Sequence, residues 1–327
     1  MDGNGDNRQG SETSAHKRLN ASATPRQNSW LRTLNVTDAP AHTDDPHCGS
    51  IGHVLPFPES CQMAADFGFD AVNADRSFLK ERGPDEVIEL MKHYDLQPGA
   101  FAFSAAFNQC HSNTEFDRSL AVFERDLSLC RAAEFKCCVG YVQPSSDRLD
   151  YYAHFTLLCE RLKRITPLLE MHDVRLGLEF IGPTTMRKKR KYDFIHTMDG
   201  IRSLIAAANA QGCVGIKLDA LHWHTSGAGL LDIEKLCPQE IVYVEIMDGL
   251  GGNYDRFSMP EFHRELPGTT GVIDIIGIIQ KLDALGFRGP VVVEPWNERI
   301  RAMNPPDAVR SIKSALDFVL EKAGVAA

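Results

Sequence analysis

The chain lacks the sequence features of membrane and secreted proteins. No apolar run approaches the roughly 18 residues that a membrane-spanning helix requires, and the N-terminal segment has no short apolar core of the signal-peptide kind. The nine cysteines are an odd number and show no C-x-x-C spacing, a pattern typical of reduced thiols inside a cell. These absences predict a cytoplasmic protein.

An excess of positive charge is also missing. The chain has 35 Lys and Arg residues against 44 Asp and Glu residues, which gives a formal net charge of -9 at pH 7. An acidic surface repels phosphodiester backbones and anionic membranes. We therefore expect a small-molecule partner rather than nucleic acid or a membrane, and association into a homo-oligomer stays open.

Aliphatic clusters are nearly absent from residues 1–47, which are rich in Asn, Asp, Ser, Thr, Gly and Arg. Such a segment cannot bury enough apolar surface to offset the entropy lost on ordering. We therefore predict a disordered tail over residues 1–47 and one domain over residues 48–327. Because 43% of the 327 residues are hydrophobic, that domain can form a single large core.

From residue 48 onward, short apolar runs rich in β-branched residues alternate with longer segments of helical period. This alternation is typical of repeated βα units around a parallel sheet. The eight predicted strands are residues 50–54, 69–75, 98–104, 136–142, 174–180, 214–222, 241–248 and 289–294. A glycine-rich phosphate loop after the first strand, which an open doubly wound sheet would usually carry, is missing. The pattern therefore predicts an α/β fold, a closed parallel eight-stranded (β/α)₈ TIM barrel.

Acidic residues stand at or near the ends of the last four predicted strands: Glu179, Asp219, Glu245 and Glu294. In such a barrel the C-terminal strand ends form one mouth, where the chemistry gathers. Any one of these acids could simply be solvated or cap the next helix. All four at one level would repel one another unless a cation lay between them. Together they therefore predict a divalent metal site.

Two further side chains belong to the same predicted strand as Asp219. Strand alternation places Lys217 on the same side as Asp219, inside the barrel and beneath the predicted metal. Its amine could instead reach the far end of the barrel. His222 follows Asp219 by three residues and could contact a substrate oxygen or complete the metal shell, although a histidine in a loop is often a surface residue.

Five motifs in the second half of the chain carry a family resemblance. They are GLEFIGP at residues 177–183, KLDALHWHTSG at 217–227, YVEIMDG at 243–249, RELPGTTGVID at 264–274 and GPVVVEPWN at 289–297. From about residue 48 to its C-terminus the chain resembles the xylose-isomerase-like TIM barrels known as sugar phosphate isomerases/epimerases. That family includes ketose 3-epimerases, inosose dehydratase and 3-dehydroshikimate dehydratase.

The resemblance assigns roles to the residues already singled out. It implies metal ligation by Glu179, Asp219, Glu245 and Glu294. It also implies substrate contacts from His222 and Arg264, beside which we count Lys217 as substrate-binding. Relatives commonly carry His or Gln at the position of Glu245. A carboxylate there adds negative charge and a hard oxygen ligand, which favours Mn²⁺ or Mg²⁺ over Zn²⁺.

The resemblance also implies a reaction. A divalent ion that chelates adjacent carbonyl and hydroxyl oxygens acidifies the neighbouring C–H bond, and Glu179 and Glu294 would exchange the proton from opposite faces, with His222 beside them. We therefore predict a metal-dependent isomerase or epimerase acting on a small polyhydroxy carbonyl compound. A lyase or dehydratase is the alternative, if the intermediate expels a β-hydroxyl group. A non-catalytic sugar-binding barrel is a third reading, whereas a DNA-repair endonuclease on this barrel would need a basic face.

Overall fold

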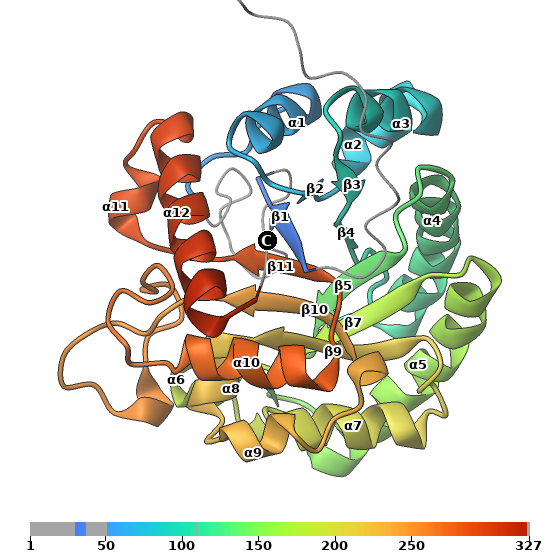
Figure 1. Cartoon of the computed structure of the whole chain (residues 1–327). Coiled ribbons are helices and arrows are strands. Elements are labelled where there is room, and N and C mark those ends of the chain that lie inside the picture. The colour runs from blue at the N-terminus through green and yellow to red at the C-terminus, as the bar shows by residue number, and fades with distance from the viewer. Residues whose placement is uncertain (1–29, 37–50, 109, 326–327) are drawn as a thin grey trace, which may run out of the picture.

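A computed structural model describes residues 30–36, 51–108 and 110–325 of the chain. Figure 1 shows a ring of helices around central strands that run in one direction. The strands of the main sheet are β1 (Leu31–Leu34), β2 (Ala71–Val72), β3 (Gln97–Pro98), β4 (Ala100–Ala102), β5 (Cys137–Tyr141), β7 (Arg175–Glu179), β9 (Val214–Asp219), β10 (Ile241–Ile246) and β11 (Pro290–Val293). A separate antiparallel pair joins β6 (Ser145–Ser146) to β8 (Tyr192–Asp193).

The barrel closes through a strand that is interrupted at Gly99. The sheet order runs β3-β2-β1-β11-β10-β9-β7-β5-β4, and its two ends, β3 and β4, are separated in the chain by Gly99 alone. The N–H of Gly99 donates to the carbonyl of Val72, and a Cβ on Gly99 would lie 2.6 Å from Oδ1 of Asn73. The nine strands of the order therefore form eight barrel positions, and the predicted eight-stranded parallel barrel is confirmed.

The prediction of the first strand at residues 50–54 is wrong. Ile51 lies in a turn, and the first barrel strand is β1, between β11 and β2. β1 lies within residues 1–47, so the barrel begins before residue 48; most of the predicted tail falls outside the described residues. The short run LRTL is not rich in β-branched residues, so the residue pattern does not predict a strand there. Its place is decided by pairing with Pro290 and Ala71 and by the contact between Arg32 Nε and Asp70 Oδ2 at 2.6 Å, because tertiary pairing outweighs β propensity.

The helices follow the predicted alternation closely. They are α1 (Phe57–Asp66), α2 (Arg76–Arg82), α3 (Pro84–His93), α4 (Asn113–Ala132), α5 (Tyr151–Met171), α6 (Thr184–Arg187), α7 (Met198–Ala207), α8 (Ala220–Thr225), α9 (Leu230–Ile233), α10 (Ile275–Leu285), α11 (Glu298–Arg301) and α12 (Pro305–Ala323), with short 3₁₀ turns at Pro238–Glu240 and Arg256–Ser258. None of these helices is both long and apolar enough to cross a bilayer. Several predicted strands are shorter in the structure, and one of these boundaries affects the site: the sixth predicted strand, residues 214–222, ends at Asp219, and His222 belongs to α8.

A layer of mostly small and medium side chains around one large one, Tyr243, fills the interior of the barrel below its mouth. Ala100, Cys137, Val242, Tyr243 and Val292 form this inner layer, while the larger core lies between the strands and the outer helices. The Tyr243 hydroxyl accepts a hydrogen bond of 2.8 Å from Nδ2 of Asn73. This layer closes the barrel from beneath, so that polar side chains further along the strands face a cavity at the C-terminal ends.

Candidate metal centre and active site

Four neighbouring strands bring their acids to one end of the barrel. Glu179 is the last residue of β7, Asp219 is the last of β9, Glu245 pairs with Asp219 across β9 and β10, and Glu294 follows β11 directly. All four are buried, with at most 4% of each residue exposed. Ligand atoms of Asp219, Glu245 and Glu294 lie within 4.8 Å of one another, and so do those of Glu179, Asp219 and His222.

Lys217 approaches this cluster from the floor of the barrel. Its Nζ lies 2.8 Å from Oε2 of Glu245 and 3.3 Å from Oε1 of Glu179. The amine therefore points toward the mouth and not toward the far end of the barrel.

Arg264 approaches the same cluster from the loop between β10 and α10. Its Nη1 lies 2.7 Å from Oδ2 of Asp219 and 2.7 Å from Oε2 of Glu294, while Nη2 contacts Oε1 of Glu261 at 2.5 Å. The side chain is 1% exposed. The loop is held in place by Asn297, whose Nδ2 donates to the carbonyl of Arg264. Arg264 therefore joins carboxylates from two strands and a loop.

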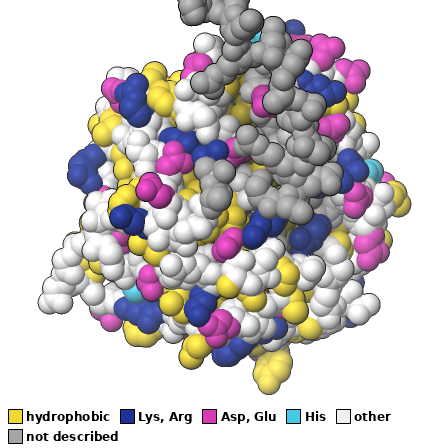
Figure 2. Space-filling view, in the orientation of Figure 1, with side chains coloured by type: hydrophobic (Ala, Val, Ile, Leu, Met, Phe, Trp, Pro, Cys, Tyr) yellow, Lys and Arg dark blue, Asp and Glu magenta, His cyan; other side chains and the backbone are white. Residues whose placement is uncertain are grey.

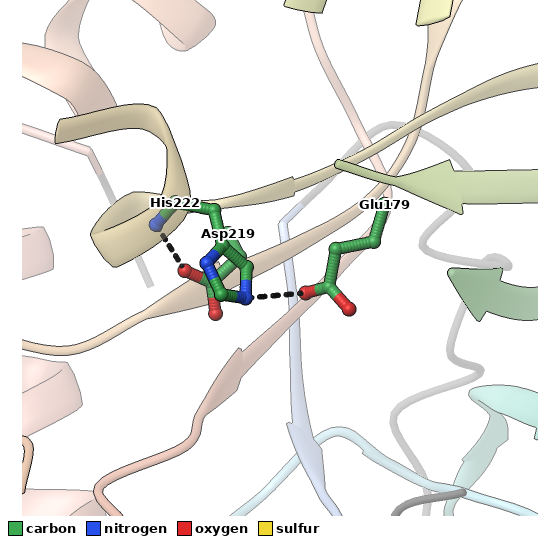
Figure 3. A group of neighbouring side chains, drawn as sticks. All are labelled: Glu179, Asp219 and His222. Carbon is green, nitrogen blue, oxygen red and sulfur yellow. Dashed lines mark hydrogen bonds and ion pairs between the residues drawn. The ribbon is translucent and has the colours of Figure 1, made fainter. Parts of the chain in front are cut away.

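His222 is fixed by the start of α8. Asp219 caps this helix, since its Oδ1 accepts a hydrogen bond of 2.8 Å from the His222 backbone N–H. Figure 3 shows the imidazole edge facing the carboxylate of Glu179, where Nε2 lies 3.8 Å from Oε1. Nε2 is buried and has no hydrogen-bond partner in the described part of the chain, although Oε1 of Glu261 is 3.4 Å away. The imidazole can therefore accept another partner.

The second glycine of the GLEFIGP motif, Gly182, lies where a side chain would not fit. A Cβ at this position would lie 2.4 Å from the carbonyl oxygen of His222 and 2.4 Å from Oγ1 of Thr225. The loop after β7 can therefore pass this close to α8 only without a side chain. The Gly182 N–H lies 3.4 Å from Nδ1 of His222 and donates to it.

The residue pattern does not predict that Glu261 belongs to the site. This residue is 4% exposed and contacts both Arg264 and His222. Glu261 lies in an irregular loop, so neither strand alternation nor helical period marks it. The one signal is its spacing of three residues before Arg264, although two such residues in a loop need not share a site.

The centre contains more negative than positive charge. Five buried carboxylates gather there with two cationic side chains, Lys217 and Arg264; the acids are Glu179, Asp219, Glu245, Glu261 and Glu294. Three negative charges therefore lack a counter-charge among the described residues if every acid is ionised. Burying uncompensated charge is costly. An oxygen-rich donor set with this imbalance fits a hard divalent cation.

The acids differ in how they respond to this crowding. Burial, reinforced by Glu294, raises the pKa of Glu245 to about 8, against the opposing effect of Lys217. Burial likewise raises the pKa of Glu179 well above its usual value. Burial also acts to raise the pKa of Asp219, but Arg264 and His222 outweigh it and hold that pKa below its ordinary value. A proton or a metal cation must therefore accompany Glu245 near neutral pH.

This shift predicts a pH-dependent stability of the metal-free protein. The unfolded chain loses the Glu245 proton near its usual pKa of 4.5, whereas the folded chain keeps it to about 8. The folded state therefore binds more protons in this window, and the free energy of unfolding should fall as pH rises through it. Urea unfolding with chelator at several pH values checks this. Saturating Mn²⁺ should flatten the slope, and Glu245→Gln should reduce it; an equal slope in that variant would contradict the assignment.

A cavity of about 340 Å³ opens beside the carboxylates. Glu179, Lys217, Glu245 and Glu294 line one part of it, and the remaining wall includes Phe103, Phe107, Asn108, His111 and Tyr141. Acidic and basic side chains are mixed over the face seen in Figure 2, whereas acids concentrate at the cavity. The cavity is large enough for a small molecule and gives it one charged wall.

Fold and site together define a parallel barrel with a buried carboxylate centre at its strand ends. A family model described as the xylose isomerase-like TIM barrel matches residues 61–321. The chain therefore belongs to the xylose isomerase-like TIM barrel family, and the resemblance stated from its motifs is confirmed.

Curated relatives of the chain are enzymes. It is similar to 3-dehydroshikimate dehydratase of Pseudomonas aeruginosa, with 24% identity over 263 residues that make up 78% of this chain and 39% of the dehydratase. It is also similar to inosose isomerase of Halalkalibacterium halodurans, with 19% identity over 245 residues that make up 75% of this chain and 83% of the isomerase. The chain thus spans well under half of the dehydratase's length.

Solved structures agree on the fold. A xylose isomerase domain protein from Alicyclobacillus acidocaldarius has a TM-score of 0.75 and 22% identity, covering 90% of this chain and 100% of that one. The IOLI protein, solved with a bound zinc atom, has a TM-score of 0.71 and 16% identity, covering 90% of this chain and 99% of that one. At these identities the likeness shows the barrel fold.

Proposed function

We propose that the chain is a divalent-metal-dependent isomerase or epimerase that moves a proton on a small polyhydroxy carbonyl compound. The observation that carries this proposal is the convergence of Glu179, Asp219, Glu245 and Glu294 at one end of a cavity. Similarity to an inosose isomerase supports the reaction class.

The metal would be held by the strand-end carboxylates. Glu179, Asp219 and Glu294 supply oxygens from three strands, and Glu245 supplies a fourth candidate. Hard oxygen donors favour Mn²⁺ or Mg²⁺, and the zinc in a structural relative supports a divalent ion in this barrel. When bound, the ion would polarise adjacent substrate oxygens and acidify the C–H bond next to them.

The remaining steps belong to side chains of this chain. Glu179 and Glu294 come from β7 and from the end of β11, which are separated in the sheet by β9 and β10. Each carboxylate can thus take or return a proton from its own side of a substrate, as general acid-base catalysis requires. His222, with its open Nε2, and Arg264 would orient the substrate oxygens, and Lys217 would contact them from the floor of the cavity.

Elimination is the second candidate function, favoured by the similarity to 3-dehydroshikimate dehydratase. The same proton abstraction leads to a lyase when a hydroxyl group lies β to the carbonyl carbon and can leave. The two reactions share their first step, so the site geometry is compatible with both.

Incubation in D₂O separates these functions. Purified protein loaded with Mn²⁺ would be given a panel of hydroxyketones and keto-polyols and followed by mass spectrometry and ultraviolet absorbance. We expect deuterium in recovered substrate or its isomer without loss of water, and no exchange after chelation. A new conjugated chromophore would support the lyase. A chelator-sensitive melting temperature without any exchange across the panel would instead indicate a binding protein.

A further inference from the structure

The contact between Lys217 and Glu245 is the shorter of the two ion pairs that Lys217 makes with acids on adjacent strands of the barrel wall. Lys217 belongs to β9 and Glu245 to β10, and their charged atoms are 2.8 Å apart. Both side chains line the cavity, and both residues are almost completely buried. The pair is therefore built into the rigid sheet, and each partner is held by its strand.

Strand register places the pair just beneath the other acids. Lys217 pairs with Tyr243, and Asp219 pairs with Glu245, so the lysine lies one inward-facing layer below the carboxylates. Tyr243 is held by Asn73 in the inner layer. Gly177 on β7 adds no side chain beside the lysine stem, since a Cβ there would lie 3.4 Å from Cβ of Lys217. The lysine is thus surrounded on the floor side, and its amine is directed upward to Glu245 and Glu179.

The two cations of the centre divide the acids between them. Arg264, from the loop at the mouth, contacts Asp219, Glu294 and Glu261. Lys217 contacts Glu245 and Glu179. Of the two acids that pair with Lys217, Glu245 is the nearer, at 2.8 Å against 3.3 Å for Glu179. An ammonium at 2.8 Å neutralises most of the charge of such a carboxylate in a buried site.

We infer that, when the metal is bound, Lys217 is the counter-ion of the Glu245 carboxylate and that the pair acts as a single, electrically neutral member of the metal centre. Glu245 can offer its second oxygen to the ion, but Lys217 cancels its charge. The ion would then be balanced by the other carboxylates of the centre and would keep more of its electron-withdrawing power toward substrate. Lys217 thus acts on the ion indirectly, through Glu245, by setting the net charge of the centre. The inference rests on the proposed metal site.

Metal affinity in a double-mutant cycle tests this inference on the full chain. Mn²⁺ binding would be measured by isothermal titration calorimetry for the wild type, Lys217→Met, Glu245→Gln and the double variant. Glu245→Gln removes the nearer of the two acids that pair with the ammonium and leaves that positive charge beside the ion, so Mn²⁺ affinity should fall at least tenfold. The double variant removes both charges and should recover at least tenfold over Glu245→Gln. Lys217→Met alone should bind Mn²⁺ more tightly than the wild type.

A buried lysine that has only a structural role should not change Mn²⁺ affinity when it is replaced, and Lys313 provides this control. Lys313 is also buried and paired with an acid, Asp317, but lies on α12 away from the centre. Lys313→Met should leave Mn²⁺ affinity unchanged. A double variant that binds no better than Glu245→Gln overturns the inference, as does weaker binding by Lys217→Met. If Lys217→Met does not fold, the comparison of the double variant with Glu245→Gln decides alone. Absence of Mn²⁺ binding in the wild type would instead overturn the metal centre itself.

Discussion

Replacing Glu179 by glutamine is expected to lower turnover roughly 10²- to 10⁴-fold, the range that a general acid or base contributes. The amide keeps the size of the side chain but cannot take up a proton, and Glu179 lies within 3.8 Å of His222 and 3.3 Å of Lys217 at the wall of the cavity. The measurement is the rate of solvent deuterium exchange into substrate at saturating Mn²⁺, so that weaker metal binding does not mimic a lost base.

Glu265→Gln provides the matched control for that loss. Glu265 lies in the same loop as Arg264 and accepts hydrogen bonds from Asn297 and Arg299, but the structure gives it no contact with the four strand-end acids. Its amide variant should exchange deuterium at nearly the wild-type rate. Wild-type exchange by Glu179→Gln would remove this residue from the catalytic step, and exchange lost equally in Glu265→Gln would point to a general structural effect.

Replacing Arg264 by methionine is expected to destabilise the metal-free protein by about 3–5 kcal/mol, the usual cost of removing one partner from a buried ion pair. The guanidinium contacts Asp219, Glu294 and Glu261, all of which are nearly inaccessible to solvent. The loss should be greater at pH 8 than at pH 5, because Arg264 holds the pKa of Asp219 down against burial, and without Arg264 this acid can take up a proton at the lower pH. Urea unfolding in the presence of chelator measures it.

Metal should partly reverse the effect of Arg264→Met. An ion bound by the same carboxylates supplies the missing positive charge, so saturating Mn²⁺ should recover more unfolding free energy in the variant than in the wild type. Arg264→Lys is the matched control: it retains a charge but not the two-nitrogen contact, and its loss should be intermediate. Unchanged stability of Arg264→Met in chelator would show that these acids are not held by Arg264.

The second half of the barrel is predictable because its signals are local. Strands β7, β10 and β11 are largely apolar runs with an acid at, just before or just after their last residue, and alternation along a strand decides which side chains face inward. The residue pattern alone therefore places Glu179, Glu245 and Glu294 at one mouth. The first strand cannot be placed in this way, since Leu31–Leu34 is marked as a strand by its pairing with β11 and β2.

For His222 the residue pattern predicts the correct position near the acids but the wrong secondary structure. The apolar run after Asp219 resembles a continuing strand, yet the Asp219 side chain accepts a hydrogen bond from the backbone N–H of His222 and caps α8, which begins at Ala220. Asp219 thus has two tasks, helix capping through Oδ1 and pairing with Arg264 through Oδ2. A residue pattern does not reveal that the two oxygens of one carboxylate accept hydrogen bonds from two different partners.

The sequence by itself determined the barrel and the four acids at its mouth, because strand period and strand ends depend on neighbouring residues. The tertiary structure alone decided which cation meets which acid: Lys217 with Glu245, and Arg264 with Asp219, Glu294 and the unforeseen Glu261. These pairings join residues from different strands and loops. Their distances depend on sheet register and loop conformation, which the closed barrel sets only as a whole.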